Sequence, residues 1–105
     1  CVCQAEGYPA AVLLRAIRPL EGLEQIAAQR SGVPAAHWCD GPGKICRALQ
    51  IDGGLNNCDL CSAAGSLWIE KGEPVAETAV RTGPRVGLGS TPEPWLSMPW
   101  RFRVG

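Results

Sequence analysis

Residues 11–24 of this chain read AVLLRAIRPLEGLE, and this stretch decides the fold that the sequence predicts. Its apolar run Val12–Leu14 is continuous rather than alternating, which is typical of a strand buried on both faces. Arg15 follows directly, so we expect its guanidinium at or near the end of that strand. A buried charge without compensation is strongly destabilising. Arg15 therefore either pairs with a neighbouring carboxylate, as a structural residue, or faces a polar cleft, where it orients an anion or a water molecule.

A helix is expected directly after this strand, over residues 20–30. Leu20, Leu23 and Ile26 share one face of it, and acidic residues occupy its first turn. Arg30 in the last turn suits the negative end of the helix dipole. Ser31-Gly32 is the expected stop signal, so this helix ends before the loop that leads to the next one.

A second helix is predicted from DGPGKICRALQI, residues 40–51. Asp40 or Gly41 can cap its start, and Pro42 suits the first turn of a helix because its missing N–H is not needed there. Its apolar residues recur at helical spacing and predict a buried stripe of Ile45, Ala48 and Leu49.

Strands are expected in the later part of the chain. The candidates are residues 67–70, 75–81 and 85–88 and the closing WRFRV of residues 100–104, while residues 58–64 form a short helix at most. Helices early and strands late indicate an α+β fold with a largely antiparallel sheet. Because no repeat or linker interrupts the chain, we expect one domain.

The composition is that of a globular protein without a strong charge signal. The 105 residues are 46% hydrophobic and 19% charged, and their formal net charge is zero. Bulk charge therefore does not indicate a nucleic-acid partner, although arginines crowd the last quarter and allow a local basic face there. No apolar stretch approaches the roughly 20 residues that span a bilayer.

Six cysteines leave three interpretations open. The pairs C-x-C at residues 1–3 and C-x-x-C at residues 58–61 could build a four-cysteine zinc site, or the set could form three disulfides. The glycine-rich knuckle typical of zinc sites is missing, and cysteine often serves as a small apolar core residue. We favour reduced thiols in an intracellular protein.

The glycine-rich segment DGPGK of residues 40–44 is a candidate phosphate site. Its glycines free backbone N–H groups at a helix start, and Lys44 adds a positive charge. It is not a P-loop, because Trp38 stands where the first glycine belongs and Ile45 replaces the magnesium-binding Ser or Thr. The alternative is an ordinary helix start with a solvated lysine.

Three further candidates are weaker. His37 is the only histidine, so any histidine-dependent catalysis needs it, yet a loop histidine beside a tryptophan is more often a surface residue. RVGLG at residues 85–89 lets a backbone carbonyl approach a ligand closely. Aromatic and basic side chains alternate in residues 100–103. The aromatic ones could stack on a base, or the two kinds could face the core and the solvent from opposite sides of one strand.

The order of the motifs is more specific than any one of them. AVLLRAIRPLEGLE, GPGKICRALQI, NNCDL, LWIEKG, PRVGLG and PWRFRV together resemble the alkyladenine (3-methyladenine) DNA glycosylase family, the class distinct from the helix-hairpin-helix glycosylases. The resemblance covers about Ala11 to Val104. It implies a formyltransferase-C-terminal-like α+β fold.

The resemblance also implies a monofunctional enzyme of base excision repair. Such an enzyme flips an alkylated or deaminated purine out of duplex DNA and hydrolyses its N-glycosidic bond with an activated water. No metal or cofactor is implied. The implied partner is double-stranded DNA with damaged purines, and we expect a monomer in the bacterial cytoplasm, associated with the nucleoid and not with a membrane.

The resemblance assigns roles to particular residues of this chain. Arg15 matches the family arginine that helps to hold the water and the phosphate of the target nucleotide. Val86 matches the residue whose main-chain carbonyl contacts that water. The residues expected to face DNA are Gly41, Gly43, Lys44 and Gly87.

Some family residues have no counterpart here. The general-base glutamate, the stacking aromatics, the active-site histidine and the intercalating tyrosine all belong before this segment, and neither Tyr8 nor His37 matches them. We therefore expect residues 1–105 to be the C-terminal part of one N-terminally truncated glycosylase domain. On its own this part should be inactive, since a general base is worth about 10²- to 10⁴-fold. The alternatives are a non-catalytic DNA-binding or vestigial product, and a small cysteine-based metal or redox module.

Overall fold

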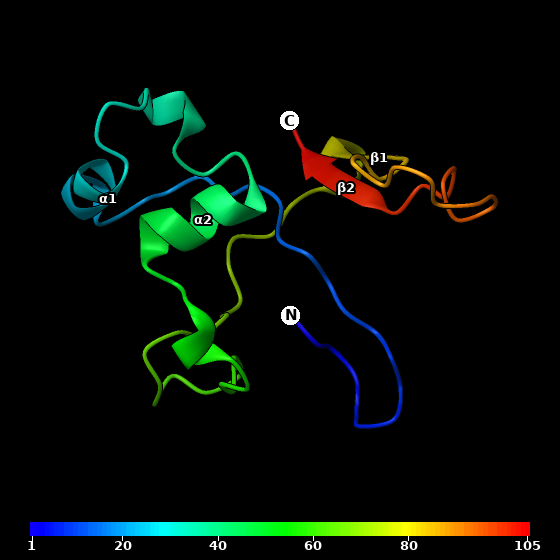
Figure 1. Cartoon of the computed structure of the whole chain (residues 1–105), viewed down its shortest axis with the longest axis horizontal. Coiled ribbons are helices and arrows are strands. Elements are labelled where there is room, and N and C mark those ends of the chain that lie inside the picture. Colours follow the sequence, from blue (N-terminus) through cyan, green and yellow to red (C-terminus); the bar gives the residue numbers. More distant parts are fainter. The chain divides into compact units, whose positions relative to one another are not determined.

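The computed structural model describes all 105 residues, which divide into two compact units, Cys1–Ile69 and Glu70–Gly105. The first unit holds two α-helices and the second a two-stranded antiparallel sheet, which confirms the α+β class (Figure 1). None of the helices is long and apolar enough to cross a membrane. The elements in chain order are α1 (Leu23–Gln29), η1 (Ala35–His37), α2 (Pro42–Leu49), η2 (Gly53–Leu55), η3 (Glu77–Ala79), β1 (Val80–Gly83) and β2 (Arg101–Val104).

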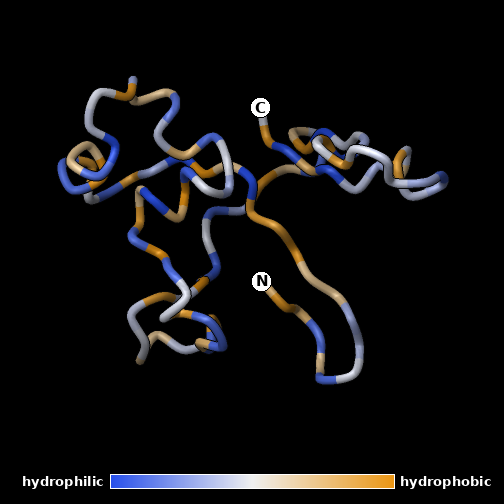
Figure 2. The backbone as a smooth tube through the Cα atoms, in the orientation of Figure 1, coloured by the Kyte–Doolittle hydropathy of each residue, from blue (hydrophilic) through white to orange (hydrophobic).

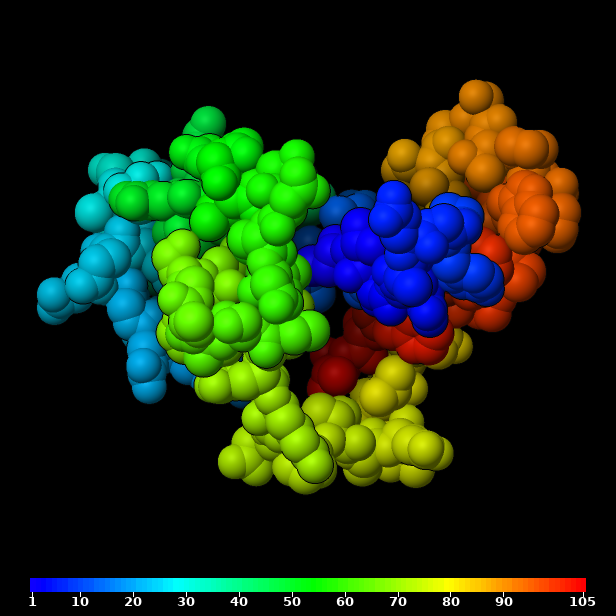
Figure 3. All heavy atoms as spheres, turned by 90° about the horizontal axis from the view of Figure 1, so that it is seen from below, coloured from blue at the N-terminus to red at the C-terminus, as the bar shows by residue number.

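The buried core of the first unit lies where α1 packs against α2. Its members are Ile26 from α1, Cys39 from the connecting loop, and Ile45 and Ala48 from α2. Trp38 packs against this cluster, and its indole N–H donates to the carbonyl of Val33 at 2.9 Å. The surfaces of the two helices adjoin in Figure 3, where α1 is cyan and α2 is green. The core is small, so each of its residues contributes a large share of the stability of this unit, and a single substitution there should be strongly destabilising.

The second predicted helix begins where the sequence places it. Gly41 is the N-cap in an extended conformation, Pro42 opens the helix, and the N–H of Ile45 donates to the Gly41 carbonyl at 2.9 Å. Ile45 and Ala48 are buried as predicted. Leu49 is 41% exposed, so the prediction that it belongs to the buried stripe is wrong. The helix ends at Leu49, and the buried cluster with α1 takes in only the other two.

The first helix is shorter than predicted. Gly22 at its N-cap has a φ of +66°, a left-handed conformation that interrupts a right-handed helix and leaves Leu20 exposed before it. The helix ends before Ser31-Gly32 as expected, with the N–H of Arg30 donating to the carbonyl of Ile26 at 2.9 Å.

The predicted buried strand at Val12–Leu14 is wrong. The segment is irregular and exposed, and Figure 2 shows an apolar stretch of backbone there. Its only pairing is with the first residues of the chain: an isolated bridge joins Val2 and Ala11, and the N–H of Val12 donates to the carbonyl of Cys1 at 2.9 Å. A strand buried on both faces needs neighbours on both edges and layers above and below, and no other segment of this unit supplies them.

The predicted strands of the later part are only partly confirmed. β2 lies in WRFRV as predicted and pairs with β1, with Val80 opposite Val104. β1 begins five residues later than predicted, because residues 77–79 form the short helix η3. No strand forms at residues 67–70, and none forms at residues 85–88, since Gly87 and Gly89 have φ values of +72° and +55° that bend the chain.

Candidate functional site

Arg15 lies exposed on the extended segment before α1 and takes part in no ion pair. Of the two interpretations of Arg15, the structural one, in which it pairs with a carboxylate, is therefore not observed. Two residues further on, the N–H of Ile17 donates to the carbonyl of Cys39 at 3.1 Å, which fastens this segment to the loop before α2. The arginine is thus carried by the same unit as the glycine-rich helix start.

A cluster of charged side chains surrounds the start of α2. Lys44 donates from Nζ to Oδ1 of Asp40 at 2.6 Å, and Nδ1 of His37 lies 2.7 Å from Oδ2 of the same carboxylate. The hydrogen bond from Lys44, followed by the one with His37, lowers the pKa of Asp40 to about 2. Asp40 thus stays ionised down to about pH 2 and pairs with Lys44 and His37. Gly41, not Asp40, is the cap of the helix.

A surface cavity of about 530 Å³ opens beside this cluster. It brings together three of the residues predicted to bind DNA, Gly41, Gly43 and Lys44. Two arginines line the same cavity and were missed from the sequence: Arg30 and Arg47. Arg47 could have been found from its place three residues after Lys44 on α2, which sets the two on one face. No local signal distinguishes Arg30 from an ordinary arginine at a helix end.

The other predicted residues, Val86 and Gly87, belong to the second unit and form a bend there. Val86 is 43% exposed, and the left-handed conformation of Gly87 suits glycine in particular. Arg85 holds the start of this bend: its guanidinium donates to the carbonyl of Trp95 at 3.3 Å and lies 5.1 Å from the ring centre of Trp100. Val86 and Gly87 are therefore presented on a loop whose first residue is anchored.

The strand β2 does not divide its side chains between core and solvent. Phe102 is 68% exposed and Trp100 is 44% exposed, and the rings of Trp95 and Trp100 lie 5.9 Å apart. Arg81 and Arg103 are register partners across the sheet, so the local basic face that the sequence allows is present there.

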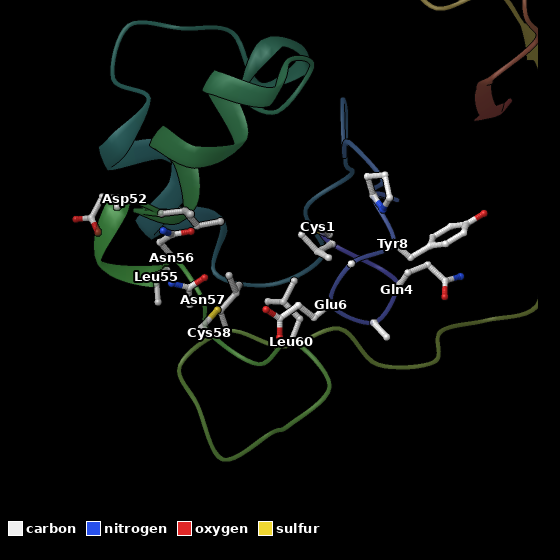
Figure 4. Close-up of a pocket in the computed structure, with 17 residues that line it drawn as sticks. Cys1, Gln4, Glu6, Tyr8, Asp52, Leu55, Asn56, Asn57, Cys58 and Leu60 are labelled. Atoms are coloured by element: carbon white, nitrogen blue, oxygen red, sulfur yellow. The ribbon is translucent and has the colours of Figure 1, made fainter.

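A larger cavity, of about 1100 Å³, contains none of the predicted site residues. It lies between the N-terminal loop, residues 1–9, and the segment of residues 51–67 (Figure 4). Tyr8 borders it, but its ring extends away from the cavity in Figure 4. We therefore place the candidate site at the smaller, cationic cavity.

The cysteines form neither of the two cross-linked arrangements. All six thiols are free, and only Cys39 is buried. No group of three or more His, Cys, Asp or Glu side chains is placed to hold a metal ion.

These features define an α+β chain in which a glycine-rich helix start lies among positively charged side chains. The sequence profile of the methylpurine-DNA glycosylase family matches residues 1–105, and the chain belongs to this family.

Individual relatives agree with the profile. A protein of Herpetosiphon aurantiacus with the provisional name 3-methyladenine DNA glycosylase is 39% identical over 105 residues, which is 98% of this chain and 47% of that protein. The human DNA-3-methyladenine glycosylase is 39% identical over 111 residues, covering 95% of this chain and 36% of the human protein. A Bacillus subtilis protein with the same provisional name is 37% identical, with 98% and 50% covered. The chain spans about half the length of most of the curated relatives it matches.

Proposed function

We propose that this chain is part of a monofunctional DNA glycosylase of base excision repair. The enzyme hydrolyses the N-glycosidic bond of alkylated or deaminated purines in duplex DNA. The observation that carries the proposal is the match of the family profile to residues 1–105. The cationic helix start supports it, because a protein that holds duplex DNA must first bind phosphates.

The reaction divides the site residues into two groups. Arg15 contacts the water and the phosphate of the flipped nucleotide, and the main-chain carbonyl of Val86 contacts the same water. An exposed arginine without a carboxylate partner is available for such a contact. Gly41, Gly43, Lys44 and Gly87 face the DNA backbone. The glycines have no side chain and let phosphates come close to the main chain, and Lys44 adds a positive charge.

The finer structural expectations accompany this proposal. Residues 1–105 form the C-terminal part of one glycosylase domain with a formyltransferase-C-terminal-like fold. The protein acts as a monomer in the bacterial cytoplasm, on double-stranded DNA that carries damaged purines, and without a metal or cofactor. The α+β content and the antiparallel pairing of β1 with β2 are compatible with that fold.

The test uses the protein encoded by the complete reading frame that contains these 105 codons. It is incubated in excess with a duplex holding a single hypoxanthine or 3-methyladenine, and abasic sites are counted after alkaline cleavage. Arg15→Gln is compared with Arg18→Gln, an exposed arginine three residues away with no assigned role. We expect Arg15→Gln to lower the single-turnover rate by about 10²-fold, because a group that stabilises the reacting water and phosphate is lost.

Two results would count against the proposal. Equal rates for the two variants would remove Arg15 from the chemistry. If the wild-type protein binds the duplex in a salt-dependent way but releases no base, the chain belongs to a non-catalytic DNA-binding product instead.

A further inference from the structure

Arg30 carries a charge that the structure leaves uncompensated. Arg30 lies at the end of α1 and is only 8% exposed, yet it takes part in no ion pair. One guanidinium nitrogen donates to the carbonyl of His37 at 3.4 Å, and Nε is buried without any hydrogen-bond partner. The negative end of the helix dipole offsets part of the charge, but a buried guanidinium ordinarily also has an anion within reach.

The side chain lines the cationic cavity, and so do the groups that an anion would use. Lys44 and Arg47 from α2 lie on its wall, beside the main chain of Gly41 and Gly43. The first N–H groups of a helix have no partners within it, and α2 presents its own at this point. The space beside Gly43 is open, since a Cβ built there meets no atom within 4 Å.

The balance of charge within the cavity also favours an anion. Of the side chains in and around it, three are positive, Arg30, Lys44 and Arg47, and one is negative, Asp40. Asp40 is already engaged by Lys44 and His37, so it compensates neither arginine. A ligand with one or two negative charges and several acceptor oxygens would compensate the charges of Arg30 and Arg47.

We propose that this cavity binds a phosphate group, with Arg30 as its buried anchor and Arg47 as its second arginine ligand. The site takes either a phosphodiester of the DNA backbone or a free phosphate, and the DNA source rests on the function proposed above. Asp40 lies at the edge of the site and repels the incoming phosphate, while it keeps the ammonium of Lys44 in position.

The first experiment titrates the protein encoded by the complete reading frame with sodium phosphate and follows its backbone amides by NMR, with sodium chloride at equal ionic strength as the reference. Amides of Gly43 and Lys44 are expected to shift and to saturate with phosphate only. Arg47→Gln, an exposed position, should raise the Kd about three- to tenfold. Arg18→Gln removes the same charge outside the cavity and should leave the Kd within about twofold.

Arg30 is tested by a pair of variants, because its burial makes a folding defect possible. Arg30→Gln should abolish saturation, and Arg30→Lys, which keeps the charge, should recover part of it. If Arg30→Gln does not fold, Asp40→Asn tests the site instead, because this variant should strengthen phosphate binding and not weaken it. It removes the repelling carboxylate and should lower the Kd about threefold or more. Saturation that is absent in the wild-type chain, or unchanged in Arg47→Gln and Asp40→Asn, overturns the proposal.

A second experiment separates the two sources of phosphate. Binding of an undamaged duplex is measured between about 50 and 200 mM salt, and the loss of one phosphate contact in Arg47→Gln should reduce the salt slope by about 1. Saturation by phosphate without this change assigns the site to free phosphate and removes its DNA source. Excision does not enter either measurement. A wild-type protein that binds phosphate here but releases no base therefore contradicts only the proposed function, and the reverse result contradicts only this site.

Discussion

Replacement of Ile45 with alanine should destabilise the first unit much more than the same change at Leu49, four residues along the same helix. Ile45 is 6% exposed in the cluster between α1 and α2, whereas Leu49 is 41% exposed. Both substitutions delete three carbon atoms and create an alanine in α2. The pair therefore compares mainly burial, and the somewhat larger gain in helix propensity for Ile45→Ala acts against the expected difference.

The magnitude follows from the carbon atoms removed. At about 0.8 kcal/mol for each buried methylene-sized group, Ile45→Ala loses about 2.4 kcal/mol of transfer free energy, and the cavity left behind raises the total to about 3 kcal/mol. Leu49→Ala should cost about 1 kcal/mol, because part of the side chain is already in water and no closed cavity forms. The difference of about 2 kcal/mol corresponds to roughly a 30-fold change in the folding constant.

Urea unfolding of the 105-residue chain, followed by circular dichroism at 222 nm and by tryptophan fluorescence, measures both values. Trp38 packs against the cluster and reports on this unit. Equal destabilisation by the two variants would refute the reasoning, since it would mean that the Leu49 face of α2 is as closely packed as the Ile45 face. A wild-type chain without any cooperative transition would also refute it, because the four-residue cluster would then not hold α1 against α2.

Three further outcomes are expected. Because the pKa of Asp40 lies at about 2, below its ordinary 3.8, the stabilisation from its contacts should be complete above about pH 4 and lost as the pH falls through 2; a carboxyl ¹³C titration with a midpoint near 4 would contradict this. Five thiols should react rapidly with Ellman's reagent and Cys39 only after denaturant is added, whereas six equal rates would show that it is not buried. Arg85→Ala should increase the mobility of the bend that carries Val86, seen as a loss of near-ultraviolet circular dichroism from Trp100, and an unchanged spectrum would show that the cation–π contact is not maintained in solution.

The second helix shows how much of this fold is encoded locally. Gly41 followed by Pro42 defines its start, and apolar residues at helical spacing define its length, so the sequence predicts its position closely. The closing strand β2 is likewise predicted by its own residues. Both elements depend on preferences that act over a few neighbouring positions.

The candidate site divides in the same way. The sequence predicts Gly41, Gly43 and Lys44 as one group, because they follow one another within four positions at a helix start. It could not predict that Arg30 joins them. That arginine comes from the end of another helix, and the packing of α1 against α2 brings it to the cavity.

Local sequence was thus enough to establish the α+β class, the position of α2 and the glycine-rich, cationic character of its start. Burial was decided only by tertiary structure. The run Val12–Leu14 has the composition of an interior strand and lies exposed, while the charged Arg30 is buried. The physical reason is that side-chain hydrophobicity sets the free energy gained by burial, but neighbouring layers must exist before that gain is realised. Here they are supplied by the contact between α1 and α2 and not around the N-terminal segment.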